Sequence, residues 1–222
     1  MTLTGGPGIT TGNAITTGNV RVFANSWWGK TTIQVTRPGK FRVLTNLPAQ
    51  SNVGAYPDVF NGKHYGWQTA GPLPQPISVV WNTPLWYTGY STAPRNPSSR
   101  FMSDFDCWYF NKGRSISGHG QTELVVANRY QGVPSGQLVF IRGGWYRWQT
   151  WITTDTTGLR WRLVLFYEVR KTAQLRISLQ AFTRFLYNHG LVHAGSWLGS
   201  VHYGFENWFA GAGETVSFHV GR

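Results

Sequence analysis

The sequence has little cysteine and few acidic residues: a single cysteine, Cys107, and eight aspartates and glutamates among 222 residues. One cysteine excludes an internal disulfide, and its aromatic surroundings predict a small buried apolar side chain. No apolar run is long enough to span a bilayer as a helix, so we expect no membrane partner. The residues after Met1 do not form a charged-then-apolar leader, so we expect that any export signal was removed or was never there.

Charge is scarce overall, and this argues against long solvated helices. Only 13% of the residues are charged, whereas 27 are glycine, 11 are proline and 16% are aromatic. Such a composition favours short strands joined by turns. The length suits one domain spanning residues 1–222, in which the Gly- and Thr-rich residues 1–18 form a loose lead-in or an edge strand.

Runs rich in β-branched and aromatic residues, separated by Gly, Pro and Asn, predict many short strands. They cover residues 20–25, 31–36, 41–44, 78–82, 104–110, 122–128, 137–141, 146–153, 161–169, 200–208 and 215–220. One segment has helical spacing instead, over residues 179–189, with Ser178 as its N-cap and Gly190 at its end. The sequence therefore predicts an all-β fold, a jelly-roll sandwich of two antiparallel sheets with a concave substrate cleft and one short helix outside.

The net charge is +12, which by itself would suggest a nucleic-acid partner. The basic residues are scattered as singles and pairs, and no nucleic-acid motif is present. We therefore interpret them as a solvated basic surface and expect no nucleic acid. A nucleic-acid binder would instead have its basic residues on the same face as its exposed aromatic rings.

Because acidic residues are few, the candidate catalytic carboxylates can be found by eliminating those with an ordinary explanation. Asp58, Asp155 and Glu214 lie in turn-like surroundings, which predicts solvated carboxylates. Glu168 lies at a strand end beside Arg170 and Lys171, where a surface ion pair is the ordinary expectation.

Asp106, Glu123 and Glu206 differ, because each lies inside an apolar or aromatic strand, where carboxylates are disfavoured unless paired or functional. Side chains alternate along a strand, so Glu206 shares a face with His202 and Trp208. Hydrolysis of a glycosidic bond uses two carboxyl groups that flank the bond. The alternative is that the three carboxylates merely neutralise nearby arginines.

At these residues the sequence resembles glycoside hydrolase family 12, the small jelly-roll endoglucanases, from about Val20 to the C-terminus. The most specific match is the motif Gly-Phe-Glu-Asn-Trp-Phe-Ala-Gly-Ala-Gly at residues 204–213. Further matches are Thr-Glu-Leu-Val-Val-Ala at 122–127, Phe-Asp-Cys-Trp at 105–108, Asn-Ser-Trp-Trp-Gly at 25–29 and Tyr-Pro-Asp-Val-Phe-Asn-Gly-Lys-His-Tyr at 56–65.

The resemblance implies a retaining endo-β-1,4-glucanase that is secreted, monomeric and free of metal and cofactor. Glu123 would be the nucleophile, Glu206 the acid/base, and Asp106 the residue that hydrogen-bonds Glu123. The residues expected to contact a β-glucan or cello-oligosaccharide are Trp28, Ser26, His64, Val125, Trp208 and Trp151. Strand alternation places Trp148 on the face opposite to Trp145 and Trp151.

Several positions depart from the family pattern. Val125 and Ala127 replace a methionine and a tryptophan, and Ser26 replaces an asparagine, so substrate choice stays open. The alternatives are a xyloglucanase, a mixed-linkage glucanase, a xylanase, or a carbohydrate-binding protein without catalysis. Retention of both Glu123 and Glu206 argues against the last of these, because a binding face needs neither.

Overall fold

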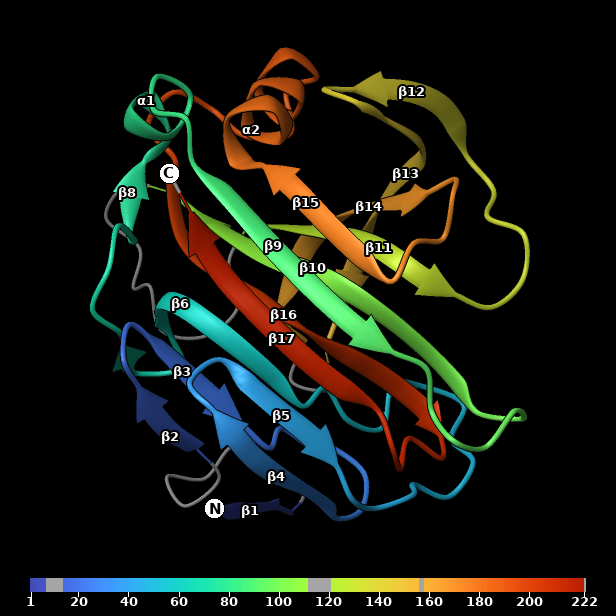
Figure 1. Ribbon diagram of the computed structural model, residues 1–222. Coiled ribbons are helices and arrows are strands. Elements are labelled where there is room, and N and C mark those ends of the chain that lie inside the picture. Colours follow the sequence, from blue (N-terminus) through green and yellow to red (C-terminus); the bar gives the residue numbers. More distant parts are fainter. Residues whose placement is uncertain (7–13, 112–120, 156–157, 222) are drawn as a thin grey trace.

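A computed structural model describes residues 1–6, 14–111, 121–155 and 158–221 as two stacked β-sheets (Figure 1). The smaller sheet has the strand order β1-β4-β5-β17-β9-β15, and the larger has β12-β13-β14-β11-β10-β16-β6-β3-β2, with β7 and β8 at its margin. This is the predicted jelly-roll sandwich, with one difference. Strands β11 and β14 pair in parallel, so the larger sheet is not wholly antiparallel.

The strands of the smaller sheet are β1 (Thr2–Gly5), β4 (Thr31–Arg37), β5 (Lys40–Val43), β9 (Trp86–Thr92), β15 (Gln174–Ser178) and β17 (Thr215–Gly221). Those of the larger sheet are β2 (Ala14–Thr17), β3 (Val20–Phe23), β6 (Asp58–His64), β7 (Trp67–Gln68), β8 (Gln75–Pro76), β10 (Arg100–Phe110), β11 (Thr122–Tyr130), β12 (Gln137–Ile141), β13 (Gly144–Thr154), β14 (Arg160–Glu168) and β16 (Trp197–Phe209). The described part of the first eighteen residues supplies an edge strand to each sheet, β1 and β2.

Most predicted strands are present, but the prediction for residues 78–82 was wrong. That segment contains the short helix α1 (Ile77–Val80), whose residues Ile77 and Val80 are buried. An apolar run of this length fits a strand or one helical turn equally well, and packing decides between them. Strands β6, β9 and β15 were not among the predicted runs.

The predicted helix is α2 (Leu179–Asn188), in which Ser178 accepts a hydrogen bond from the backbone of Ala181 at 3.3 Å. Gly190 follows with φ at +67°, a conformation that suits glycine at a helix end. Phe182 and Leu186 are buried against the sandwich, and Trp148 packs beneath α2 on Phe166 and Phe185. Trp148 therefore faces the core, on the side opposite to the exposed Trp145 and Trp151, and this opposition is what strand alternation predicted.

The core lies between the two sheets and contains Phe105, Tyr203, Phe205 and Phe218, with Cys107 fully buried beside them. Close approach of the sheets depends on Gly89 of β9. A Cβ atom at this position would lie 2.4 Å from the Tyr203 ring. The outer face of the larger sheet is thus left for the polar and aromatic side chains that alternate with the core.

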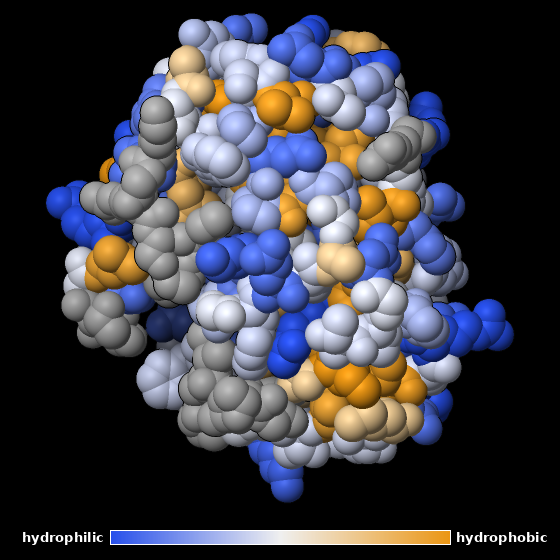
Figure 2. Space-filling view, turned by 90° about the vertical axis from the view of Figure 1, so that its left-hand side faces the viewer, coloured by the Kyte–Doolittle hydropathy of each residue, from blue (hydrophilic) through white to orange (hydrophobic). Residues whose placement is uncertain are grey.

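The surface mixes residue types. Hydrophilic and hydrophobic residues are interspersed on the face shown in Figure 2. Among the described residues, no helix combines the length and apolar character needed to cross a membrane.

Candidate active site

A cleft of about 740 Å³ lies on the outer face of the larger sheet. Successive cleft-facing residues alternate with core residues along β10, β11, β14 and β16, as the period of a strand requires. The lining residues are Asn25, Trp27, Trp28, Asn52, Val53, Tyr56, His64, Tyr65, Met102, Asp106, Trp108, Glu123, Val125, Trp151, Thr153, Asp155, Trp161, Leu163, Leu165, Tyr167, His202, Glu206 and Trp208.

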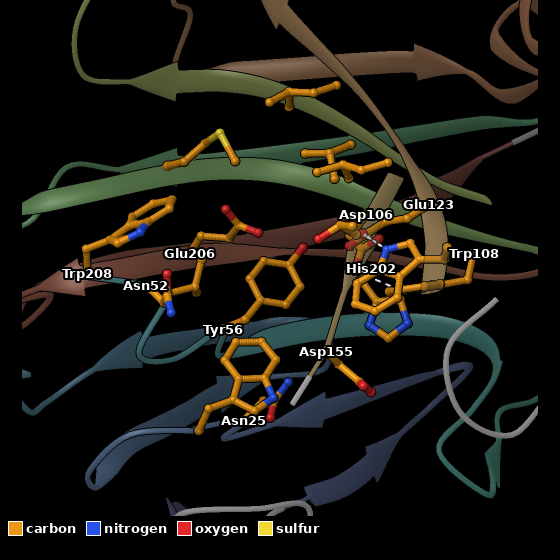
Figure 3. Close-up of a pocket in the computed structure, with 18 of the residues that line it drawn as sticks. Asn25, Asn52, Tyr56, Asp106, Trp108, Glu123, Asp155, His202, Glu206 and Trp208 are labelled. Atoms are coloured by element: carbon orange, nitrogen blue, oxygen red, sulfur yellow. Dashed lines mark hydrogen bonds between the residues drawn. The ribbon is translucent and has the colours of Figure 1, made fainter. Parts of the chain in front are cut away.

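The three predicted catalytic carboxyl groups meet in this cleft. Asp106 lies on β10, which is flanked by β11 with Glu123 on one side and by β16 with Glu206 on the other. Glu123 pairs in register with Trp108, and Glu206 with Met102, so the two glutamates flank the segment of β10 that carries Asp104 and Asp106. In Figure 3, Glu206 points across the cleft toward Asp106 and Glu123, with the Tyr56 ring beside the gap.

Each glutamate has a different environment. The indole of Trp161 donates a hydrogen bond of 2.6 Å to Glu123 Oε2. Burial raises the pKa of Glu123 to about 7, and the bond from Trp161 opposes this rise because it stabilises the carboxylate. Burial together with the nearby charge of Glu123 raises the pKa of Glu206 to about 8. An ionised Glu123 thus favours the protonated form of Glu206, so the pair suits a state with one charged and one neutral carboxyl group.

Asp106 is held differently from the family-based expectation. Its Oδ2 accepts a hydrogen bond of 2.9 Å from the indole of Trp108. Its Oδ1 is buried without a hydrogen-bond partner among the described residues. Burial and the charge of Glu123 raise the pKa of Asp106 well above its usual range. The bond to Glu123 therefore stays a prediction, and it requires a proton on one of the two groups.

A fourth carboxyl group, Asp104, lies under the cleft on the same strand. Its side chain is fully buried, and neither carboxyl oxygen has a hydrogen-bond partner among the described residues. Burial and then the charge of Glu206 raise the pKa of Asp104 well above its usual range. A neutral Asp104 is therefore the form that this environment favours.

Of the predicted substrate contacts, Trp28, His64, Val125, Trp151 and Trp208 line the cleft. Trp28 and Trp151 have 49% and 40% of their surface exposed, so a flat ligand could stack on either ring.

Ser26 is the exception among these predictions. Its side chain is fully buried, and its hydroxyl lies within hydrogen-bond distance of the carbonyls of Gly29 and Gly54. Ser26 therefore holds the loop that carries Trp28, and its side chain does not face the cleft.

Several acidic residues lie in environments that the sequence did not predict. Asp58, expected in a solvated turn, is fully buried in β6 and pairs with His202. Glu214, also expected in a turn, is fully buried and accepts a hydrogen bond of 3.0 Å from Asn207. Local sequence could not reveal either burial, because the covering residues come from distant segments.

Glu168 was expected to form an ion pair with Arg170 or Lys171. Its carboxylate instead accepts hydrogen bonds from the backbone and hydroxyl of Thr172, and within the described ranges it is in no ion pair. The Lys171 ammonium donates to the Gly132 carbonyl at 2.7 Å. The backbone N–H of Asp155 donates to the Leu159 carbonyl at 3.0 Å, and Asp155 also lines the cleft.

Sequence reasoning missed Trp161 and Tyr167, although a signal was present. Both lie on one face of β14 with Leu163 and Leu165, and this alternation could have placed them on a common face, although not beside Glu123.

The charge of the cleft tests the nucleic-acid alternative. The described residues that line it include no lysine or arginine, whereas Asp106, Glu123, Asp155 and Glu206 are acidic. A nucleic-acid groove needs cations along the phosphate backbone. The aromatic face therefore has the wrong charge for such a ligand. In the described part of the chain, no three metal-ligating side chains cluster at a possible metal site.

Comparison with solved structures shows which known proteins have a similar fold. No protein-family model matches the chain, and no curated sequence matches it. An endoglucanase from Rhodothermus marinus aligns with a TM-score of 0.81 at 24% identity, over 99% of this chain and 97% of that one. A family 12 xyloglucanase from Bacillus licheniformis aligns with a TM-score of 0.84 at 17% identity, over 99% and 98%. A xyloglucanase domain of a type three effector from Sinorhizobium fredii, solved with cellobiose, aligns with a TM-score of 0.75 at 14% identity, over 100% and 98%. The predicted resemblance to the family 12 glycoside hydrolases is thus confirmed at the level of the fold.

Proposed function

We propose that this protein, which has the fold of the family 12 glycoside hydrolases, is a retaining endo-β-1,4-glucanase. The observation that supports it most is the convergence of Glu123 and Glu206 in one aromatic cleft, with the pKa of Glu206 raised to about 8 and that of Glu123 to about 7. A retaining glycosidase needs a nucleophile that ionises and an acid that keeps its proton. The two environments meet these needs.

In the proposed first step, Glu123 attacks the anomeric carbon of the bound glucosyl unit. Glu206 donates its proton to the departing glycosidic oxygen, so the bond between the two sugars breaks as the glycosyl-enzyme bond forms. In the second step Glu206, now ionised, removes a proton from water. The water oxygen displaces Glu123 from the anomeric carbon, and both residues return to their starting states.

The cleft also suits the proposed substrate. It offers exposed indole faces at Trp28 and Trp151, and sugar rings have apolar faces that stack on such surfaces. The substrate would be a neutral β-1,4-glucan or a cello-oligosaccharide, and we propose extracellular action by a monomer, since such polymers lie outside the cell.

A second candidate substrate is xyloglucan, whose backbone is branched. Beside Glu123 the cleft is lined by Val125, Met102 and Leu165, which pack in one cluster with the buried Ala127 and Tyr130, without a tryptophan at position 127. Small side chains at positions 125 and 127 leave more room than the family pattern does. Initial rates on carboxymethylcellulose, barley β-glucan, xyloglucan and xylan separate the candidates, because each predicts a different preferred polymer.

The mechanism is tested by the stereochemistry of the first product. Proton NMR of cellopentaose hydrolysis should show the β-anomer first, since two displacements retain configuration. Glu123→Ala should form no glycosyl-enzyme. Glu206→Ala should still give a burst with a substrate whose leaving group needs no proton, and added azide should accelerate its turnover.

The geometry gives an independent criterion. A retaining pair has carboxyl groups about 5–5.5 Å apart, whereas an inverting pair is about 6.5–9.5 Å apart. Initial release of the α-anomer, or a crystal structure with the larger separation, would overturn the retaining assignment.

A further inference from the structure

A buried chain of hydrogen bonds runs from the interior of the larger sheet to the cleft. Asp58 Oδ2 lies 2.5 Å from His202 Nδ1, and His202 Nε2 lies 2.8 Å from His64 Nδ1. The three residues come from two adjacent strands, β6 and β16. Each has 2% or less of its surface exposed. Neither the proposed mechanism nor the sequence motifs assign a role to Asp58 or His202.

The contact between Asp58 Oδ2 and His202 Nδ1 gives each of these buried side chains a hydrogen-bond partner. Burial raises the pKa of Asp58, and attraction to His202 opposes that rise. An ionised Asp58 can only accept a hydrogen bond in this contact, so His202 must donate it and keeps its proton on Nδ1. His202 is also held by stacking on Phe60, with ring centroids 4.8 Å apart, and by the Ser200 hydroxyl, 3.0 Å from Nε2. The imidazole therefore has one orientation and one fixed donor.

The proton on His202 Nδ1 determines which nitrogen of His64 carries a proton. With its proton on Nδ1, a neutral His202 has a lone pair on Nε2, and the partner nitrogen of His64 must supply the proton. His64 would then be protonated on Nδ1. Its ring stacks on Tyr65 at a centroid distance of 3.6 Å and lies 5.3 Å from the Trp108 ring, whose indole holds Asp106. His64 thus links Asp58 to the cleft, which His202 also lines.

We infer that Asp58 and His202 are positioning residues for His64, fixing its ring and its tautomer for contact with the glucan. The inference rests on the proposed function, because it names what orients one sugar-contacting residue of that cleft. It predicts that loss of the pair weakens substrate binding through His64, while the reaction at Glu123 and Glu206 continues.

A double-mutant cycle tests whether the effect passes through His64. The double variant Asp58→Asn/His202→Phe, here termed the uncoupled variant, removes the hydrogen-bonded relay, keeps an aromatic ring against Phe60 and leaves no unpaired buried charge. His64→Phe keeps the stacking on Tyr65 but cannot hydrogen-bond. We expect the uncoupled variant to raise KM for cellopentaose about 3- to 10-fold, the loss of about one hydrogen bond, with little change in kcat.

The decisive comparison is made in the His64→Phe background. Residues that act only through His64 should have no further effect there, so the combined variant should have the KM of His64→Phe alone. Glu168→Gln, a carboxylate-to-amide change outside the cleft lining, is the matched control and should leave KM unchanged. If the uncoupled substitutions raise KM by the same factor in the wild type and in His64→Phe, the inference is overturned.

A second readout does not depend on activity. Nitrogen-15 NMR of the histidines should show His64 protonated on Nδ1 in the wild type. In the uncoupled variant, measured where both proteins are fully folded, His64 should have a changed tautomer. An unchanged His64 tautomer would overturn the inference even if KM rises. If the wild type hydrolyses no glucan, the proposed function fails, yet the NMR result still decides whether Asp58 and His202 control His64.

Discussion

At the scale of single residues, the cleft combines exposed aromatic faces with carboxyl groups that resist ionisation. Trp28 is about half exposed on a loop that the buried Ser26 holds in place. Glu123 is tuned by a hydrogen bond from Trp161, a residue 38 positions away in sequence. These two tryptophans have different expected roles, one in binding and one in setting a pKa, and each can be tested separately.

Trp28→Ala should weaken binding of cello-oligosaccharides without loss of the fold. A stacked indole contributes about 1–3 kcal/mol, so Kd measured by calorimetry on the Glu123→Ala protein should rise by roughly 5- to 150-fold. Because the side chain is 49% exposed, the melting temperature should stay nearly constant. A collapsed melting temperature with unchanged Kd would show that Trp28 is a core residue.

Trp161→Phe should raise the pKa of Glu123, because the lost hydrogen bond favoured the ionised form. The acidic limb of the profile of kcat/KM against pH should then move upward by roughly one pH unit, the effect of one bond to a charged group. Trp145→Phe is the control, since Trp145 is exposed and outside the cleft lining. An acidic limb at the wild-type position in Trp161→Phe would remove Trp161 from the tuning of the nucleophile.

At the scale of elements, strand β16 places Glu206 by lying close against β6. Gly204 pairs with Asp58, and a Cβ atom at Gly204 would lie 2.4 Å from the Pro57 carbonyl oxygen. Close packing of the two strands thus explains why the Gly-Phe-Glu motif has a glycine at position 204. Its absence of a side chain lets the two strands approach while Phe205 fills the core and Glu206 faces the cleft.

Gly204→Ala should therefore destabilise the protein, by about 1–3 kcal/mol as for other overpacked sites. The free energy of unfolding from urea titration should fall, and kcat should fall with it because Glu206 moves with the strand. Gly6→Ala is the matched control, since no atom lies within 4 Å of the Cβ position there. Equal stability of the two variants would contradict this account of the strand contact.

At the scale of the whole molecule, four carboxyl groups gather on the outer face of the larger sheet, at the aromatic cleft. They belong to Asp104, Asp106, Glu123 and Glu206. Burial is the main cause of the raised pKa in each case. A carboxyl group whose pKa is higher in the folded state than in the unfolded state lowers stability once pH exceeds the unfolded value. The site therefore costs folding free energy at neutral and basic pH, where unfolded glutamates are ionised.

Glu206→Gln should relieve part of this cost. Its stabilising effect should be absent near pH 4, grow as pH rises past about 4.5, and reach its full size above about 8. We expect the melting temperature of the variant to exceed that of the wild type by a few degrees, about 2–4 °C, at pH 8 and to equal it at pH 4. Glu168→Gln is the control outside the cleft, and an identical pH dependence in both variants would refute the explanation.

The sequence alone predicted the class of fold and singled out the carboxyl groups that line the cleft floor. Runs of β-branched and aromatic residues identified most of the strands, the spacing of Leu179, Phe182 and Leu186 identified α2, and carboxylates inside such strands singled out Asp106, Glu123 and Glu206. These features depend on residues close together in the chain, so local patterns reveal them. The buried Cys107 follows from the same patterns, as does the placement of Trp148 opposite to Trp145 and Trp151.

Only the tertiary structure decided what depends on contact between distant segments. Asp58 and His202 are 144 positions apart, so no local pattern indicated that a turn-like aspartate would be buried beside a histidine. The bond from Trp161 to Glu123 and the parallel pairing of β11 with β14 arise in the same way. Burial, and with it the raised pKa of Asp106, Glu123 and Glu206, is set by what packs over a residue.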